Sequence, residues 1–230
     1  FLIENLKLMT EEELMTKEID EVVETLKELE PVSIVLMGSF AREEWTSKSD
    51  AEVAVVFEDS NYHSRTELKK YGSDRVRVYP FRLSELLELR SVIPFPRKFY
   101  FWWLKNTSKM LWGKDVLTQL QIKMEQADWR ENLVFQKGVA LSDLLSFRNN
   151  DLETAGWAFS KSCLFATVST LALRGKEVKS FRGASALATK EFPDFQDVIK
   201  KAESVWYGKS KLEEKDVFRN FEYFFFLENI

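Results

Sequence analysis

The chain has 230 residues, with 33 basic and 37 acidic side chains and a formal net charge of -4. Hydrophobic residues make up 45% of it, including 19 Phe and 7 Trp, which is enough for a sizeable core and excludes disorder over most of the length. The single cysteine, Cys163, excludes an internal disulfide and a thiolate-clustered zinc site, and the single histidine, His63, excludes sites that need two imidazoles from one chain. Any chemistry must therefore depend mainly on carboxylates, hydroxyls, Lys and Arg.

Nothing in the sequence indicates a membrane protein. No apolar run approaches the roughly 20 residues that cross a bilayer, because Lys, Arg or Glu interrupts each one. Phe1–Met9 is too short for a secretory signal, and Glu4 falls too early in it. We therefore expect a soluble, cytoplasmic protein without a membrane contact.

The first part of the chain alternates helical and strand patterns. Residues 1–30 hold ten acidic and three basic side chains, and Thr10 with Glu13 makes a capping box before apolar residues recur at helical spacing up to Pro31. This pattern predicts a surface helix packed on a sheet. Short apolar or alternating runs predict strands at 33–37, 51–57, 75–79 and 109–115. Residues 62–70 and 83–89, which lie between or after these strands, suit helices. We expect the third strand to end at Pro80.

From about residue 128 the pattern changes, because long stretches with helical periodicity replace the short β-branched runs. The clearest predicted helices span 129–147, 152–173, 195–207 and 212–227. We place a domain boundary near residue 120. This gives a first domain at 1–120 with helices and strands and a second, all-helical domain at 121–230.

The residues that indicate chemistry lie at the end of the first strand and the start of the second. Gly38 and Ser39 end the first strand, and Asp50 and Glu52 stand two residues apart where the second begins. Side chains at this spacing on a strand point to the same face, so both carboxylates should project toward whatever lies beside the Gly-Ser turn. Such a pair suits one or two Mg²⁺ or Mn²⁺ ions, which commonly share oxygen ligands with substrate phosphates.

The Gly-Ser turn suits the phosphate half of such a site. Gly38 allows close backbone approach, the Ser39 hydroxyl and backbone N–H groups can hold a phosphate oxygen, and the helix expected to follow offers its positive N-terminus. Arg42 and Lys48 are candidates to neutralise further phosphate charge. Solvated surface charge is the alternative for both.

In this stretch the sequence resembles the DNA polymerase β-like nucleotidyltransferase superfamily, especially its small, minimal members. Their signature is a hydrophobic residue, Gly and Gly or Ser, then a spacer and Asp-hydrophobic-Asp/Glu-hydrophobic. Here it stands as Met37-Gly38-Ser39 and Asp50-Ala51-Glu52-Val53. Farther along, residues 111–115 resemble a strand and turn of aminoglycoside nucleotidyltransferases.

The resemblance implies an α/β (α+β) nucleotidyltransferase fold with a short mixed sheet. It also implies that Gly38 and Ser39 hold the triphosphate of ATP or another nucleoside triphosphate, while Asp50 and Glu52 bind the metal. The reaction would then be metal-dependent transfer of a nucleoside monophosphate, AMP for ATP, to an acceptor hydroxyl with release of pyrophosphate. The acceptor is expected to be a small molecule or a protein rather than RNA, and a homo-oligomer is left open.

The sequence departs from the family at its third carboxylate, which members usually carry on a later strand as a metal ligand and general base. Here Arg75 or Arg77 occupies the strand face where the third carboxylate is expected. Asp74, the candidate for the third catalytic position, is out of phase by one residue, so in a regular strand it would point to the opposite face. A bulge that turns Asp74 inward would restore the third carboxylate, whereas a regular strand would leave two. Milder departures are Glu52 in place of the commoner Asp, and Glu43 where glycine is frequent.

The second half resembles, weakly, the helical domains that accompany such transferases, including HEPN-type domains and the substrate domain of aminoglycoside adenylyltransferases. The residues that carry this resemblance are 161–180 and 190–193. HEPN ribonucleases need an Arg with a His a few residues on, and the sequence has no histidine beyond His63, so ribonuclease activity is excluded.

Two alternatives to the transferase remain open. The chain could be a catalytically impaired binding or antitoxin-like module that has the fold and lacks the third carboxylate. It could instead add nucleotides to RNA, which requires a positive groove supplied by residues 97–114, where basic and aromatic side chains alternate without an acid. We interpret that stretch as core-facing aromatic residues with a basic outer face, because the overall charge is acidic.

Overall fold

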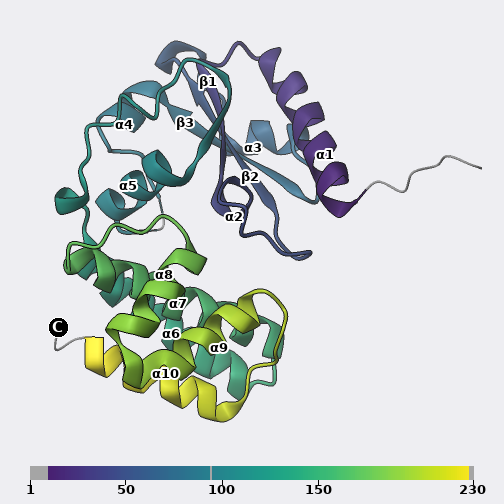
Figure 1. Ribbon diagram of the computed structural model, residues 1–230. Coiled ribbons are helices and arrows are strands. Elements are labelled where there is room, and N and C mark those ends of the chain that lie inside the picture. The colour runs from purple at the N-terminus through teal and green to yellow at the C-terminus, as the bar shows by residue number, and fades with distance from the viewer. Residues whose placement is uncertain (1–9, 94, 228–230) are drawn as a thin grey trace, which may run out of the picture. The chain divides into compact units, whose positions relative to one another are not determined.

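The computed structural model describes residues 10–93 and 95–227 (Figure 1). The opening segment Phe1–Met9, judged above not to be a secretory signal, lies outside the described residues. The chain forms two compact units, the first from the described residues up to Ser91 together with Ser108–Leu120, and the second from those of Val92–Thr107 and from Gln121 onward. None of the helices within 10–93 and 95–227 combines the length and apolar character that a membrane span needs.

The first unit is built on one four-stranded mixed sheet with the order β3-β2-β1-β4. The strands are β1 (Ser33–Met37), β2 (Ala51–Phe57), β3 (Val76–Arg82) and β4 (Lys109–Gly113). Strand β1 runs antiparallel to β2 and β4, whereas β2 and β3 are parallel. A parallel pair needs a crossover connection, which here contains α3 (Arg65–Leu68) between two short 3₁₀ turns, Asp59–Asn61 and Lys69–Tyr71. The mixed sheet agrees with the predicted fold class.

Helix α1 (Glu11–Lys27) begins at the predicted capping box. The Thr10 hydroxyl accepts a hydrogen bond from the Glu13 backbone N–H at 3.2 Å, and the Glu13 carboxylate accepts one from the Thr10 N–H at 2.7 Å. Its apolar face, which includes Met15 and Leu26, packs with Leu68 of α3 in the core of this unit. Figure 1 shows α1 lying along the sheet. Because α1 and α3 share one core with alternate strand residues, they cover one face of the sheet and leave the intervening side chains on the other.

Strand β3 is longer than predicted, since it continues through Pro80 to Arg82. Proline lacks the N–H that a central strand must donate to its neighbour. Strand β3 lies at an edge of the sheet and pairs only with β2 among the described strands. Pro80 is therefore tolerated inside it, and the prediction that Pro80 ends the strand is wrong by two residues.

The second unit is helical, as predicted for the C-terminal region. Its helices are α5 (Arg97–Thr107), α6 (Trp129–Arg148), α7 (Leu152–Leu173), α8 (Phe181–Glu191), α9 (Gln196–Trp206) and α10 (Glu214–Leu227), with 3₁₀ turns at Met124–Gln126 and Pro193–Phe195. Helix α7 is buried on nearly all sides and packs against α6, α8, α9 and α10. Two further short helices within the described residues, α2 (Gly38–Ala41) and α4 (Leu83–Leu87), belong to the first unit.

Helix α5 accounts for the basic and aromatic stretch. Phe99, Trp102 and Trp103 are buried, whereas Arg97 and Lys98 are exposed. The interpretation of this stretch as core-facing aromatic residues with a basic outer face is thus confirmed along α5. The sequence patterns do not predict the helix itself, because five consecutive aromatic residues have no helical period.

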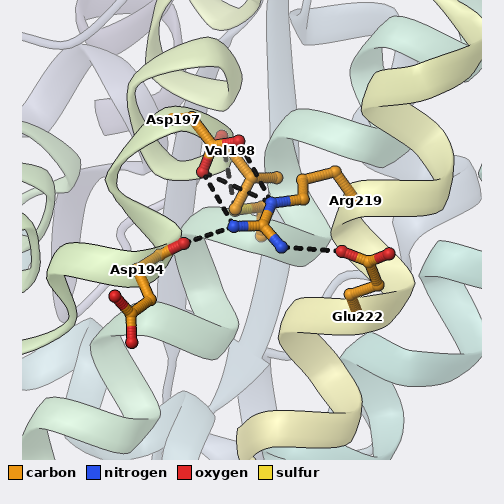
Figure 2. Close-up of polar contacts among 6 residues, drawn as sticks. Asp194, Asp197, Val198, Arg219 and Glu222 are labelled. Atoms are coloured by element: carbon orange, nitrogen blue, oxygen red, sulfur yellow. Dashed lines mark hydrogen bonds and ion pairs between the residues drawn. The ribbon is translucent and has the colours of Figure 1, made fainter.

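A cluster of contacts around Arg219 of α10 connects this helix to the start of α9 (Figure 2). The Arg219 Nε lies 3.1 Å from an Asp197 carboxylate oxygen, Nη1 lies 2.6 Å from Glu222, and Nη2 donates to the backbone carbonyl of Asp194. The guanidinium carbon also lies 4.6 Å from the centre of the Phe195 ring. With its donors engaged on three sides, Arg219 stabilises the helical unit.

Candidate functional site

The Gly38–Ser39 turn lies directly against the carboxylate of Glu52. Met37, the last residue of β1, is in register with Glu52 on the antiparallel strand β2. Gly38 follows with a φ of +73°, and a β-carbon at this position would overlap Oε2 of Glu52. Glycine is therefore required here both for the left-handed backbone conformation and for the space that the carboxylate takes.

The turn continues into α2, which has only four residues. The sequence predicts a helix whose positive N-terminus helps to hold phosphate, but a single turn adds few aligned peptide dipoles. The loop after α2 is fixed by the stacking of Phe40 on Trp45, with ring centres 4.9 Å apart, and by a 2.9 Å hydrogen bond from the Glu44 N–H to the Ser39 carbonyl. Phosphate contacts at this turn must therefore come from individual N–H groups and side chains.

A close charged contact joins Arg77 of β3 to Asp50. The Arg77 Nη2 lies 2.6 Å from Oδ2 of Asp50, and the two side chains are 57% and 31% exposed. Arg77 is also in register with Glu52 on the adjacent parallel strand, so both side chains leave the sheet on the same face. The guanidinium therefore lies beside the carboxylate pair and remains accessible from solvent.

Tyr79 extends this charged face along β3. Burial of its half-buried ring and the negative charge of Glu52 raise the pKa of the Tyr79 phenol, while Arg65 and Arg77 act in the opposite direction. The Arg65 guanidinium carbon, from α3, lies 4.7 Å from the centre of the ring. At neutral pH the phenol is therefore protonated, and two arginines lie within its electrostatic surroundings.

Asp74 does not join this group. It is exposed in the bend before β3. The pairing of β2 with β3 is regular from Ala51 opposite Val76 to Phe57 opposite Arg82, so no bulge turns Asp74 onto the sheet face. The residue opposite Glu52 on β3 is Arg77. The structure therefore follows the second alternative left by the sequence, a regular strand with two carboxylates.

The two predicted phosphate-binding cations lie in different surroundings. The Arg42 Nε lies 3.0 Å from a carboxylate oxygen of Glu44, and both side chains are almost fully buried. A buried pair of this kind is costly to break, which favours a structural role for Arg42. Lys48 is exposed in the turn before β2, where its backbone N–H is 3.4 Å from the Thr46 hydroxyl. Lys48 as a phosphate ligand stays a prediction.

Glu43 stands at a position where the sequence signature frequently has glycine. Its φ of +58° lies in the left-handed region, which explains why glycine suits this position in the family that the sequence resembles. Lys109 of β4 lies 2.7 Å from the Glu43 carboxylate, and its hydrogen bond and charge lower the pKa of that carboxyl group. The loop between α2 and β2 is therefore attached to β4 by an exposed ion pair.

The described residues do not complete a divalent-metal site in this arrangement. Within 10–93 and 95–227, no three side chains of the His, Cys, Asp and Glu types lie close enough to hold a metal ion together. One oxygen of Asp50 is already engaged by a guanidinium at contact distance. A divalent cation on that carboxylate would therefore face a second positive charge at short range. Asp50 and Glu52 as metal ligands stay a prediction that this geometry does not favour.

Comparisons with known proteins agree with the fold. Residues 19–110 match the family model described as the nucleotidyltransferase domain. The structure is similar to the crystal structure of spectinomycin adenyltransferase AAD(9) from Enterococcus faecialis with ATP and spectinomycin, with a TM-score of 0.58 and 15% sequence identity, over 93% of this chain and 98% of that one. At this identity the likeness shows the fold alone. A comparison with curated protein sequences found no match. Residues 19–110 thus match a nucleotidyltransferase domain, in agreement with the resemblance seen in the sequence.

Proposed function

We propose that this chain binds a nucleoside triphosphate, with ATP as the first candidate, and transfers its nucleoside monophosphate to an acceptor hydroxyl. The nucleotidyltransferase domain at residues 19–110 supports such a transfer in general terms. The observation that carries the proposal is the contact between the Gly38–Ser39 turn and Glu52. It joins the two halves of the sequence signature, the phosphate-binding turn and the carboxylate strand, into one site beside Asp50 and Arg77.

The proposed acceptor is a small molecule with a free hydroxyl group. The structural neighbour was solved with ATP and spectinomycin, which supports a nucleotide together with a small acceptor. Acceptor recognition varies widely on one fold, since it depends on residues outside the shared site. We propose that the helical domain from residue 121 onward supplies it, and that the chain acts in the cytoplasm, where nucleoside triphosphates are abundant.

In the proposed step the acceptor oxygen attacks the α-phosphorus of the triphosphate. The bond from the α-phosphorus to the oxygen that bridges it to the β-phosphorus breaks, and pyrophosphate leaves. The proton of the hydroxyl passes to a carboxylate, for which Glu52 is the candidate, because Asp50 is engaged with Arg77 and Glu52 has no ion pair among the described residues. The exposed guanidinium of Arg77 supplies positive charge next to the departing phosphates. Because the described residues do not complete a metal site, no step here depends on a metal ion.

A second candidate is a nucleotide-binding module that does not turn over its ligand. The ion pair between Arg77 and Asp50 and the exposed position of Asp74 favour it, because together they leave the site without a third carboxylate. Addition of nucleotides to RNA has less support, since four of the five consecutive aromatic residues of α5 that would stack on bases are buried: Phe99, Phe101, Trp102 and Trp103.

The test uses the full chain with ATP labelled at the α-phosphate, a panel of hydroxyl-bearing acceptors that includes aminocyclitols, and buffers with Mg²⁺, with Mn²⁺ or with EDTA. Label transferred to an acceptor, together with pyrophosphate release that Glu52→Gln abolishes, supports the transferase. ATP binding by calorimetry without release in any buffer supports the binding module. Absence of ATP binding at millimolar concentration refutes both.

A further inference from the structure

Resting on the proposed function, we infer that Arg77 takes the place of a divalent cation in this site, so that the chain binds its nucleoside triphosphate without a metal ion. Arg77 is the one residue of β3 that is in register with Glu52 and also in contact with Asp50. It is therefore a fixed positive charge beside the two carboxylates that the sequence signature assigns to metal binding.

The sign of the charge at position 77 decides whether the site needs a divalent cation to bind a triphosphate. A carboxylate there would join Asp50 and Glu52 as a third negative charge, and a triphosphate could approach such a group only with cations between them. Arginine changes the formal charge of this position by two units relative to a carboxylate. The carboxylate pair is then partly neutralised by the chain itself, and the need for a divalent ion falls.

The guanidinium also has the geometry for phosphate. It presents several N–H donors in a planar fork that matches two oxygens of one phosphate group, and it keeps its charge at every physiological pH. The Arg77 side chain is more than half exposed, and its Nη2 is the atom that contacts Asp50. Donors on the same guanidinium thus remain for a ligand that enters from solvent, while Asp50 holds the group in place.

The neighbouring residues make this position different from an ordinary surface pair. Tyr79 lies within electrostatic reach of both Glu52 and Arg77, and Arg65 lies over its ring. Arg75, two residues earlier, shows the contrast, because its guanidinium pairs with Glu11 of α1, 3.2 Å away. Arg75 thus provides a matched control, an arginine immediately before the same strand whose partner lies on α1.

The experiment measures ATP binding to the full chain by calorimetry in EDTA and in Mg²⁺, for the wild type and for Arg77→Gln, Arg77→Glu and Arg75→Gln. We expect the wild type to bind with a dissociation constant that differs by less than about threefold between the two buffers. Arg77→Gln should bind at least about tenfold more weakly in EDTA, since a charge-assisted hydrogen bond contributes about 1.5–3 kcal/mol and 1.4 kcal/mol corresponds to a factor of ten. Arg75→Gln should stay within about twofold of the wild type.

The reversal at position 77 gives the sharpest outcome. Arg77→Glu supplies the missing carboxylate, so its ATP binding should be lost in EDTA and recovered in Mg²⁺. Binding by the wild type that needs Mg²⁺, with Arg77→Gln unchanged, overturns the inference and leaves the proposed function standing. Absence of ATP binding by the wild type in both buffers overturns the proposed function and the inference with it. Circular dichroism melting of each variant confirms that the chain is folded.

Discussion

Asp143 of α6 gives the helical unit a pH dependence that can be calculated in advance. Its side chain is fully buried, and neither carboxylate oxygen has a hydrogen-bond partner among the described residues. Burial raises the pKa of Asp143 to about 7 from an ordinary value of 3.8. An ionised carboxylate without a partner is costly in such surroundings, so the folded state holds the proton that the unfolded chain has already released.

The sign follows from proton linkage. Between pH 4 and pH 7 the folded chain binds one proton more than the unfolded chain at Asp143, so the free energy of unfolding falls as the pH rises. Each pH unit in this interval costs about 1.4 kcal/mol, so the change from pH 5 to pH 7 amounts to about 2.7 kcal/mol at most. Above pH 7 the contribution levels off, because Asp143 is then ionised in both states.

The assay is urea denaturation followed by circular dichroism at pH 5, 6, 7 and 8, for the wild type, Asp143→Asn and Asp151→Asn. We expect Asp143→Asn to remove most of the decline and to be more stable than the wild type at pH 8. Asp151 caps α7 and accepts a hydrogen bond from the Thr154 N–H at 3.1 Å; its pKa is lowered by Thr154, so it is ionised throughout this range and serves as the control. Equal pH slopes for the wild type and Asp143→Asn would refute the reasoning.

Substitutions at three further positions test the site and the fold. Gly38→Ala should lower the unfolding free energy by about 1–2 kcal/mol, because residue 38 has a positive φ. It should also abolish ATP binding, because the added β-carbon displaces the Glu52 carboxylate. A variant that melts and binds ATP like the wild type would contradict the contact between Gly38 and Glu52. Glu43→Gly should be more stable than Glu43→Ala by about 1 kcal/mol in urea titration. Both variants lose the ion pair with Lys109, but only glycine relieves the strain of the positive φ at position 43. Equal stabilities of the two variants would exclude backbone strain at this position. Arg219→Ala should destabilise the chain by about 1–3 kcal/mol. Arg219→Lys should recover only part of this stability, because lysine lacks the planar guanidinium that contacts three partners. Full recovery in Arg219→Lys would show that the positive charge alone matters.

Much of the first unit could be predicted because its elements have strong local signals. The capping box at Thr10 marks the start of α1, and the buried strands 33–37 and 51–57 are apolar runs bounded by turn residues. The signals fail where tertiary context decides. Pro80 is compatible with a strand only because β3 is an edge, and the position of β3 in the sheet cannot be read from its own residues.

The role of Arg42 shows a similar limit within the site. A charged residue beside a phosphate-binding turn is a reasonable candidate ligand, and nothing in its own sequence position says that it is buried. Its partner Glu44 stands two residues away, a spacing that no helix face brings together. Only the folded loop, with Phe40 stacked on Trp45, places the two charges in contact away from solvent.

The sequence alone does not say whether Arg75 or Arg77 occupies the position of the third carboxylate. Residues two apart on a strand share a face, so the alternation of side chains cannot distinguish them. The structure resolves it by where β3 begins. Arg75 precedes the first paired residue, Val76, and is held by α1, so it is not part of the strand face. Arg77 is opposite Glu52 inside the ladder. A one-residue shift of β3 would move Arg77 to the other face of the sheet and bring Asp74 toward the face that carries Glu52. The register of a single edge strand therefore decides whether this site carries a third negative charge or a positive one.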